Sequence, residues 1–419
     1  MRPIRLTLVA ILLPAAACGG ERGAAVPTVR DSAGITIVEN AGTVWAEGRG
    51  WTVADTPTVS IGGLEGEAAA DMSGIIGVVR LSDDRLAVAN GAGPDIRFFD
   101  PAGAHLRTSG RKGSGPGEFQ TLAGLFGFDG DSLLAADMLT RRMTVLAPDG
   151  SAAREFTLGG AGGMQVGEQS VSLAIPVGAF PDGSVLGMAQ AFRINQAPAG
   201  AYRDTAAYVV FGPDGAVRDT AIRMPGIEME QVTMNFMGRE FTAPQPVPLG
   251  RITTLAVRSG TIAAARNDRY EIEVHSTDGT LVRLVRVAMA PRPVTEADQA
   301  AHRKEQLNVL ANAPGMGAVP EPLKQQLRAR IEQVKYPATY PYVQEMRYDP
   351  DGNLWVGEVQ PAGTTVRVYA VFDTAGALLG RVTMPDRFTP LWLGRDAVAG
   401  VWKDADDIEH VRVYTVRKP

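Results

Sequence analysis

The chain has 419 residues, of which 45% are hydrophobic and 21% are charged, and these proportions exclude wholesale disorder. The formal net charge of −5 argues against a general nucleic-acid binder. The 48 glycines and 28 prolines exceed the usual share of these residues, and their spread along the chain predicts many turns between short strands.

The N-terminus has the pattern of a bacterial export signal. Two arginines precede an apolar run over residues 6–13 that is too short to span a bilayer. Ala15–Ala17 then lead into Cys18, the only cysteine of the chain, in an arrangement that resembles the lipobox of bacterial lipoproteins. We therefore predict a signal peptide over residues 1–17, lipidation of Cys18 and a flexible tether over residues 18–33. The alternative is ordinary cleavage after the alanines, with Cys18 incidental.

From residue 34 to residue 419 the chain repeats a unit of four short strands, joined by turns rich in Asp, Asn and Gly. The first two units are offset by 47 residues (Gly103 to Gly150), which matches the period of about 40–50 residues of β-propeller blades. Six units begin near residues 76, 123, 175, 253, 343 and 391. The predicted fold class is therefore all-β, as a six-bladed β-propeller over residues 34–419.

The sixth unit reaches the end of the chain after only three strands. Two apolar segments near the N-terminus, residues 34–39 and 58–63, have no place in the other units. We expect one of them to supply the fourth strand of the sixth blade, because a closed ring leaves no open sheet edge to pair with other chains.

The segment GRKGSGPGEF (Gly110–Phe119) links the first two units. This link, together with the strand and turn pattern of residues 34–416, resembles the bacterial six-bladed β-propeller lipoproteins related to NHL repeats. The resemblance implies a propeller fold and a location on the cell envelope. It implies no particular chemistry, since the family has no single established activity.

One insertion, residues 294–342, breaks the strand pattern between the fourth and fifth units. Thr295 and Asp298 have the spacing of a helix-capping box, and good helix formers follow them. A second helix with an apolar stripe is expected before an aromatic strip that prolines interrupt. The insertion is interpreted either as a lid over the channel or as a decoration on the outer wall. As a lid, it would line the channel mouth with Tyr336, Tyr340 and Tyr342.

In a propeller blade, strands A to D run antiparallel from the inside outward. The A–B and C–D turns therefore share one end of the ring, and the B–C loops and the links between blades share the other. Polar residues end five of the predicted B strands: Asn90, Asp137, Gln190, Asn267 and Glu358. Their oxygen atoms predict a ligand-binding ring at the B–C loop end, and such a ring could hold Ca²⁺. The alternative is that each side chain caps its own strand or bonds its own turn.

No catalytic residue is indicated by the sequence. The histidines contain no close pair of the kind that binds zinc, and neither a nucleophile elbow nor a phosphate-binding loop is present. The sequence predicts no cofactor, apart from a Ca²⁺ ion that the polar ring could hold.

Two functions fit these observations. The preferred one is a non-enzymatic, lipid-anchored binding or scaffold module that holds a protein, peptide or glycan partner at the B–C loop end. The alternative is a lactonase-type hydrolase, which would need a tight cluster of Glu, Asp and Asn around a divalent metal at the channel mouth. Gly19 after the cysteine, by analogy with enteric bacteria, indicates sorting to the outer membrane, on its periplasmic or surface side.

Overall fold

The structure is a computed structural model that describes residues 25–63, 72–128, 130–159, 164–166, 169–171, 175–190, 198, 200–236, 239–312 and 316–419. The predicted signal peptide and Cys18 lie outside these residues. The described chain consists mainly of β-strands, with two α-helices, α1 (Glu296–Asn312) and α2 (Glu321–Gln333). No helix in these ranges is long and apolar enough to cross a membrane.

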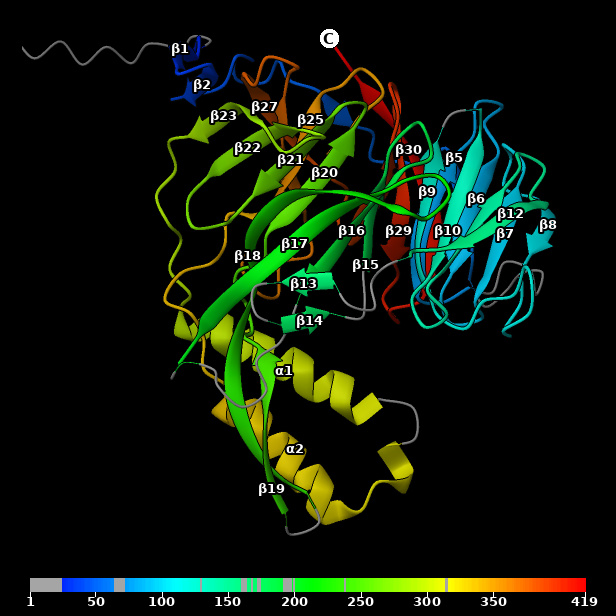
Figure 1. The fold of residues 1–419 in the computed structure, drawn as a ribbon, viewed down its shortest axis with the longest axis vertical. Coiled ribbons are helices and arrows are strands. Elements are labelled where there is room, and N and C mark those ends of the chain that lie inside the picture. The colour runs from blue at the N-terminus through cyan, green and yellow to red at the C-terminus, as the bar shows by residue number, and fades with distance from the viewer. Residues whose placement is uncertain are drawn as a thin grey trace, which may run out of the picture.

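Six sheets of four or more strands follow one another along the described chain (Figure 1). The first two are β5 (Ile75–Arg80), β6 (Leu86–Asn90), β7 (Asp95–Phe99) and β8 (His105–Ser109), then β9 (Leu122–Phe128), β10 (Ser132–Asp137), β11 (Arg142–Leu146) and β12 (Ala152–Thr157). The third is β15 (Ile175–Ala179), β16 (Val185–Gln190), β17 (Tyr202–Phe211), β18 (Val217–Phe236) and β19 (Arg239–Pro246). A separate hairpin pairs β13 (Met164–Val166) with β14 (Gln169–Val171).

The other three sheets follow in the same manner. The fourth is β20 (Thr254–Arg258), β21 (Thr261–Ala265), β22 (Glu271–Ser276) and β23 (Leu281–Val287), extended by β2 (Ile35–Asn40) and β1 (Thr28–Ser32). The fifth is β24 (Val343–Tyr348), β25 (Leu354–Glu358), β26 (Val368–Phe372) and β27 (Leu378–Thr383). The sixth is β28 (Phe388–Leu393), β29 (Ala397–Lys403) and β30 (Glu409–Arg417), with β3 (Thr52–Val53) and β4 (Val59–Ile61).

The first strands of the sheets stand side by side around a common centre. β5 contacts β9, β9 contacts β15, β15 contacts β20, β20 contacts β24, and β28 contacts β5. Within the described residues, six buried hydrophobic clusters each join two neighbouring sheets, and one of them joins the sixth sheet to the first. Every residue of β6 is buried, because this strand is covered on both faces. This arrangement is a β-propeller, and it is stabilised chiefly by the apolar surface buried between sheets.

An N-terminal segment completes the sixth sheet. β4 pairs antiparallel with β30, with Ile61 opposite Val411, and β3 pairs further along the same strand. Ile61 is buried in the cluster that also contains Val88 of the first sheet. Residues 58–63 therefore take the place that the three-stranded unit leaves open. Residues 34–39 do not, because they fall within β2, which lies parallel to β23 at the outer edge of the fourth sheet.

The predicted tether over residues 18–33 needs a correction, because its last residues form β1. β1 pairs antiparallel with β2, with Val29 opposite Val38. The chain reverses at Ala33 and Gly34, which both have positive φ angles (54° and 84°), as a two-residue hairpin turn requires. Composition alone suggested a tether, since the pairing partner that orders this segment does not show in its polar sequence.

The recurring glycine of the C–D turns has a steric cause at two positions. Gly215 and Gly279 have φ angles of 79° and 87°. A Cβ atom at these positions would lie 2.2 Å from the Thr157 carbonyl oxygen and 2.0 Å from the Ala221 carbonyl oxygen. Each turn therefore rests directly on the backbone of the preceding sheet, and only glycine fits there.

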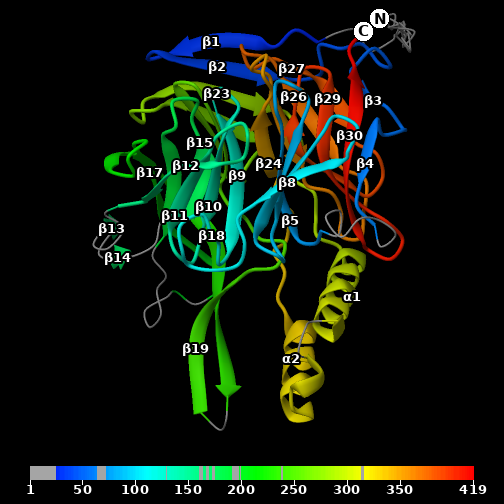
Figure 2. The same ribbon diagram turned by 90° about the vertical axis from the view of Figure 1, so that its right-hand side faces the viewer.

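Two segments project from the B–C loop end (Figure 2). One is the pair α1 and α2, which follows β23 and precedes β24, and the other is the long β18–β19 hairpin. The Arg330 guanidinium of α2 donates to Gln245 Oε1 of the hairpin at 2.8 Å. At the start of α1, the Thr295 N–H donates to the Asp298 carboxylate and the Asp298 N–H donates to Thr295 Oγ1. This is the cap that the sequence spacing predicts.

Candidate functional site

Asn90 is the first member of the polar ring expected at the B–C loop end. Its side chain is 2% exposed. Oδ1 accepts the Ser73 N–H at 3.2 Å, and Nδ2 donates to the Gly93 carbonyl and to the Asp95 carboxylate, both at 3.3 Å. Asn90 therefore ties its own B–C turn to the residues that precede β5.

Asp137 is 1% exposed and is held in the same way in the second sheet. Its carboxylate accepts backbone N–H groups from the link before β9 and from the B–C turn, namely those of Gln120, Thr121, Leu139 and Thr140. Burial opposes ionisation of this carboxyl, but the backbone hydrogen bonds outweigh burial and lower its pKa. Arg142, the first residue of β11, donates to the carbonyls of Ser114 and Gly115 in the link Gly110–Phe119.

Asn267 joins the fourth sheet to the fifth. It is 1% exposed, and its Oδ1 accepts the N–H groups of Tyr342 and Val343 at 3.2 and 2.8 Å. Its Nδ2 donates to the carbonyls of Ile252 and Val343 at 2.8 and 2.9 Å. The residue adopts a φ of 70°, which asparagine tolerates better than most residues.

Glu358 forms a two-fold ion pair with Arg381, with both N–O distances 2.9 Å. Burial, reinforced by the Glu358 carboxylate, raises the pKa of the adjacent Tyr270 hydroxyl well above its usual value. Gln190 ends β16, but its side chain lies outside the described part of the structure. The contacts of Asn90, Asp137 and Asn267 match the alternative interpretation, in which polar side chains hold turns and links, whereas Glu358 pairs with Arg381 of β27. Ligand binding by the ring stays a prediction.

The three tyrosines of the insertion lie at the base of the helices. A hydrogen bond of 3.1 Å joins the Tyr336 hydroxyl to His302 of α1. Tyr340 is 3% exposed, and its hydroxyl accepts the Ala362 N–H at 3.0 Å. Tyr342 packs against the core between the fourth and fifth sheets. These contacts fasten the insertion to the fifth sheet, and a role for the tyrosines in ligand binding stays a prediction.

The cavity that all six sheets share is called the principal cavity, and it lies at the opposite end of the propeller. It has a volume of about 620 Å³ and is lined by the ends of β5, β9, β15, β20, β24 and β28 and by A–B turns that follow these strands. All six sheets therefore contribute to one site at the A–B turn end.

Three arginines, one from each of three sheets, line this cavity. Arg80 is paired with Asp84 at 2.8 Å, and Arg347 with Glu345 at 3.3 Å. Arg258 is exposed at the end of β20 and forms no ion pair within the described residues. It is therefore the guanidinium that a ligand could approach without displacing a carboxylate.

Two aspartates also line the cavity, but protein groups already occupy their oxygens. The Asp131 carboxylate accepts the N–H and the hydroxyl of Ser82 at 2.9 and 2.5 Å. Asp349 is 4% exposed and accepts the Trp355 indole N–H at 3.1 Å and the Asn353 N–H at 2.9 Å. The cavity therefore presents positive charge more readily than negative charge.

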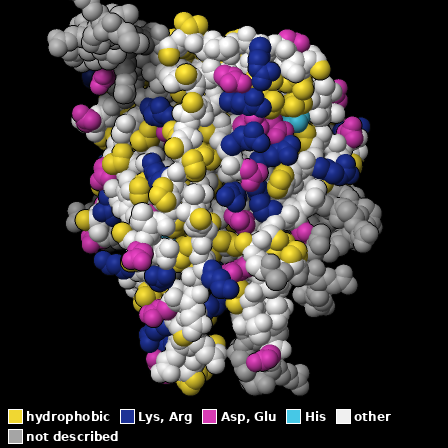
Figure 3. All heavy atoms as spheres, turned by 90° about the vertical axis from the view of Figure 1, so that its left-hand side faces the viewer, with side chains coloured by type: hydrophobic (Ala, Val, Ile, Leu, Met, Phe, Trp, Pro, Cys, Tyr) yellow, Lys and Arg dark blue, Asp and Glu magenta, His cyan; other side chains and the backbone are white. Residues whose placement is uncertain are grey.

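On the outer surface of the fourth sheet, in contrast to the cavity, basic and acidic side chains are interleaved (Figure 3). Arg286 bonds Glu271 at 2.5 Å and Glu39 at 3.3 Å. Arg266 bonds Glu273 at 2.5 Å. These groups neutralise one another, so this surface is a network of ion pairs.

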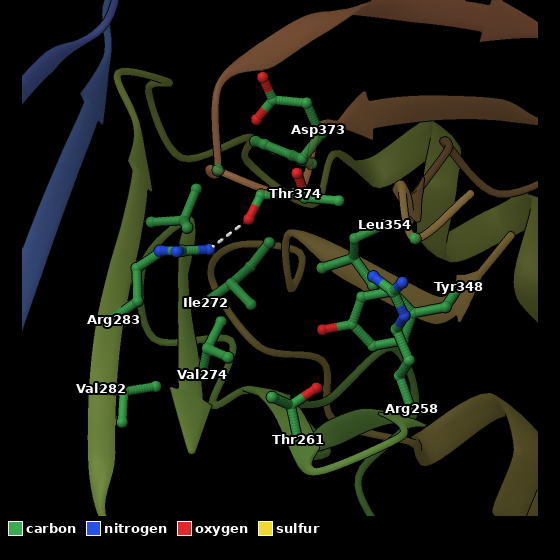
Figure 4. Close-up of a pocket in the computed structure, with 14 residues that line it drawn as sticks. Arg258, Thr261, Ile272, Val274, Val282, Arg283, Tyr348, Leu354, Asp373 and Thr374 are labelled. Atoms are coloured by element: carbon green, nitrogen blue, oxygen red, sulfur yellow. Dashed lines mark hydrogen bonds between the residues drawn. The ribbon is translucent and has the colours of Figure 1, made fainter. Parts of the chain in front are cut away.

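A second, smaller pocket of about 210 Å³ lies between the fourth and fifth sheets at the A–B turn end, and it shares Arg258 and Tyr348 with the principal cavity (Figure 4). Arg283 enters it from β23 and donates to the Thr374 carbonyl at 2.6 Å. Burial raises the pKa of Tyr348, against the opposing effects of its hydrogen bond with Thr261 and of the two arginines. The two cavities are thus neighbours around a shared cationic rim.

A metal centre requires several donor side chains that lie close together. In the part of the chain that the structure describes, no group of three or more His, Cys, Asp or Glu side chains is placed to hold a metal ion. A calcium site built on three such side chains is therefore not present among the described residues.

The sequence interpretation concentrated on residues that end B strands and missed the arginines that end A strands. A signal was present, because Arg80 and Arg258 are the last residues of β5 and β20, and Arg347 is the last but one residue of β24. Arg283 carries no such signal, since its position in the pocket depends on how two sheets pack.

No protein-family model matches this chain, and no curated protein matches it. Solved structures share its general arrangement at low identity. A member of the DUF4221 family from Bacteroides vulgatus is 9% identical, with a TM-score of 0.48, and the match covers 88% of this chain and 99% of that one. A gluconolactonase from Xanthomonas campestris is 13% identical, with a TM-score of 0.42 over 82% and 86% of the two chains. The calcium-binding protein regucalcin from Agrobacterium tumefaciens is 9% identical, with a TM-score of 0.35 over 91% and 97%. Similarity at this level transfers neither an activity nor a ligand to this chain.

Proposed function

We propose that this protein is a lipid-anchored binding protein of the bacterial cell envelope, built as a closed six-bladed propeller that receives its ligand at the A–B turn end. One observation carries the proposal: a single cavity of about 620 Å³ is lined by the first strands of all six sheets. This differs from the expected B–C loop end, where Asn90, Asp137 and Asn267 already use their polar atoms within the fold.

The same proposal places this end of the propeller toward the membrane. The Ala25 N–H donates to the Thr43 carbonyl, and the Val44 N–H donates to the carbonyl of Leu378, just after a C–D turn. The described chain therefore begins at the end that carries the A–B and C–D turns. If Cys18 bears the lipid, the intervening residues 19–24 reach at most about 20 Å. The projecting helices and the β18–β19 hairpin then point away from the membrane.

The anchor is tested by replacing Cys18 with Ser and fractionating the cells. We expect the variant to leave the membrane fraction, because the acyl chains that would hold the protein in the membrane are missing. Membrane retention equal to that of the wild type would contradict the anchor and leave the cavity proposal standing.

The binding site is tested with the mature chain and a panel of small anionic, neutral and cationic compounds, followed by ligand-observed NMR. Ser259→Trp places a large ring at the exposed rim of the cavity, and Ala92→Trp places the same ring on the exposed B–C side as the control. We expect at least one compound of the panel to bind the wild type and Ala92→Trp but not Ser259→Trp. Binding that is lost in Ala92→Trp and kept in Ser259→Trp would place the site at the B–C loop end.

The lactonase-type alternative is tested on the same preparation. Near-stoichiometric calcium in the purified protein, together with calcium-dependent hydrolysis of a lactone, would replace binding by catalysis. We expect neither result, because the described residues provide no cluster of metal ligands.

A further inference from the structure

We propose that the pocket between the fourth and fifth sheets binds a small monocarboxylate with an apolar body. This inference rests on the proposed function, because it assigns a ligand class to the same end of the propeller. The pocket lies beside the principal cavity and has its own volume of about 210 Å³. At about 30 Å³ per water molecule, this volume corresponds to about seven waters, which is the scale of a compact ligand such as benzoate.

The charge of the pocket favours an anion. Arg258 and Arg283 line it, and neither forms an ion pair within the described residues. Other arginines of the same sheet, Arg266 and Arg286, are each bonded to a glutamate. Two arginines without a carboxylate partner in one pocket form a site where a ligand carboxylate would complete charge-assisted hydrogen bonds.

The one carboxylate that lines the pocket does not neutralise these arginines. Asp373 Oδ1 accepts the N–H groups of Ala375 and Ala377 at 2.9 and 2.8 Å and so holds its own C–D turn. Arg283 instead donates to a neutral carbonyl, that of Thr374, and its buried Nε atom has no partner among the described residues. The positive charge of Arg283 therefore has no carboxylate partner in the described chain, and a bound anion would supply one.

The walls of the pocket favour a ligand whose uncharged part is apolar. Apolar side chains from both sheets line it: Ile272, Val274, Val285, Leu354 and Phe372. All five are buried in the fold and form a firm base, and Val282, which is 38% exposed, adds accessible apolar surface to the pocket. Figure 4 shows Arg283 and Tyr348 reaching into the pocket from opposite walls, with Ile272, Val274 and Leu354 between them. A polyanion without an apolar part would leave this surface without a partner, whereas an aromatic or short aliphatic carboxylate satisfies both features.

The test compares three molecules of the same shape on the mature full chain: benzoate, neutral benzamide and cationic benzamidine. Titration calorimetry measures affinity, and ligand-observed NMR measures weak binding. We expect benzoate to bind at least about tenfold more tightly than benzamide, because only the carboxylate carries a negative charge and can accept two parallel bonds from one guanidinium. Equal binding of benzoate and benzamide, or no binding of benzoate, would overturn the proposal.

Substitutions locate the bound molecule. Arg258→Gln should weaken benzoate at least about fivefold, and Arg111→Gln should leave it within about twofold. The control removes the same charge from an 82% exposed side chain at the other end of the propeller. Val282→Glu adds a negative charge at a partly exposed pocket residue and should also weaken benzoate, so the test does not depend on one variant folding. An unchanged affinity in both Arg258→Gln and Val282→Glu would overturn the proposal.

One further comparison separates this inference from the proposed function. Arg283→Gln alters only the smaller pocket, and Ser259→Trp alters only the principal cavity. We expect benzoate to be weakened by the first variant and retained by the second. Benzoate that is lost only with Ser259→Trp would overturn the smaller pocket as its site while supporting the principal cavity.

Discussion

The two ends of the propeller use polar side chains in opposite ways. At the B–C loop end, the polar atoms of Asn90, Asp137 and Asn267 are bonded to backbone groups. At the A–B turn end, Arg258 and Arg283 line cavities and have no carboxylate partner in the described chain. Residue type alone therefore does not distinguish a binding group from a structural one. The number of bonds that a group already makes within the fold does.

The largest effect that tests this comparison is expected at Asn267. Asn267→Ala removes the acceptor of two backbone N–H groups and places alanine at a φ of 70°. We expect the free energy of unfolding to fall by about 3–4 kcal/mol, since buried donors without partners cost about 1–3 kcal/mol each. Asn267→Gly should be about 1 kcal/mol less harmful, because glycine accepts this backbone conformation. Denaturant unfolding measures both, and a loss below about 1 kcal/mol for both variants would argue that the amide is available to ligands.

The next effect concerns Glu358 and Arg381 at the B–C loop end. Glu358 is largely buried, and its removal leaves a half-buried guanidinium without its carboxylate. We expect Glu358→Gln to lower the free energy of unfolding by about 1–2 kcal/mol. The matched control is the exposed pair of Asp351 and Arg395 at the other end, where Asp351→Asn should cost less than about 0.5 kcal/mol. Equal losses in the two variants would remove the contrast between the ends.

Asp137 makes the stability of the B–C loop end depend on pH. Its folded-state pKa is lowered, so its contribution is fully present above the ordinary aspartate pKa and is lost as the pH falls through the folded-state value. We expect the wild type to lose more stability than Asp137→Asn as the pH is lowered from 5 to about 3. Thermal unfolding at each pH measures this difference. Parallel curves for the two proteins would show that the carboxylate of Asp137 is not held by its backbone partners.

The smallest effect on stability is expected at Arg258. This side chain is exposed and forms no ion pair within the described residues. Arg258→Gln should therefore change the free energy of unfolding by less than about 0.5 kcal/mol, the usual range for surface substitutions. A loss above about 1 kcal/mol would place Arg258 with the structural polar residues and weaken its assignment to a binding rim.

Local patterns predicted much of the fold. The recurring pattern of strand and turn residues marks the starts of β5, β9, β15, β20, β24 and β28, and the spacing of Thr295 and Asp298 marks the start of α1. The missing strand of the sixth unit was also predictable, because an odd strand must find a partner. The pairing of β1 and β2 with the fourth sheet was not, since β2 meets β23 from the far end of the sequence.

The candidate site was much less predictable. Asn267 is of a residue type that can bind a ligand. The bonds that make it structural join it to Val343, 76 positions further along the chain, so the local sequence does not reveal them. Arg283 lies in an outer strand, and its entry into a pocket follows from the contact between the fourth and fifth sheets. Both assignments depend on neighbours that are distant in the sequence.

The sequence by itself determined the order of the strands, the turn chemistry and the need for an N-terminal strand to close the ring. The patterns of short strands and turn residues extend over only a few positions, so they can be recognised in the sequence. Only the tertiary structure decided which end holds the cavity and which polar groups retain bonding capacity. The physical reason is that a hydrogen bond or a desolvated charge depends on atoms within a few ångströms in space, and for Asn267 and Arg283 some of those atoms belong to the neighbouring sheet.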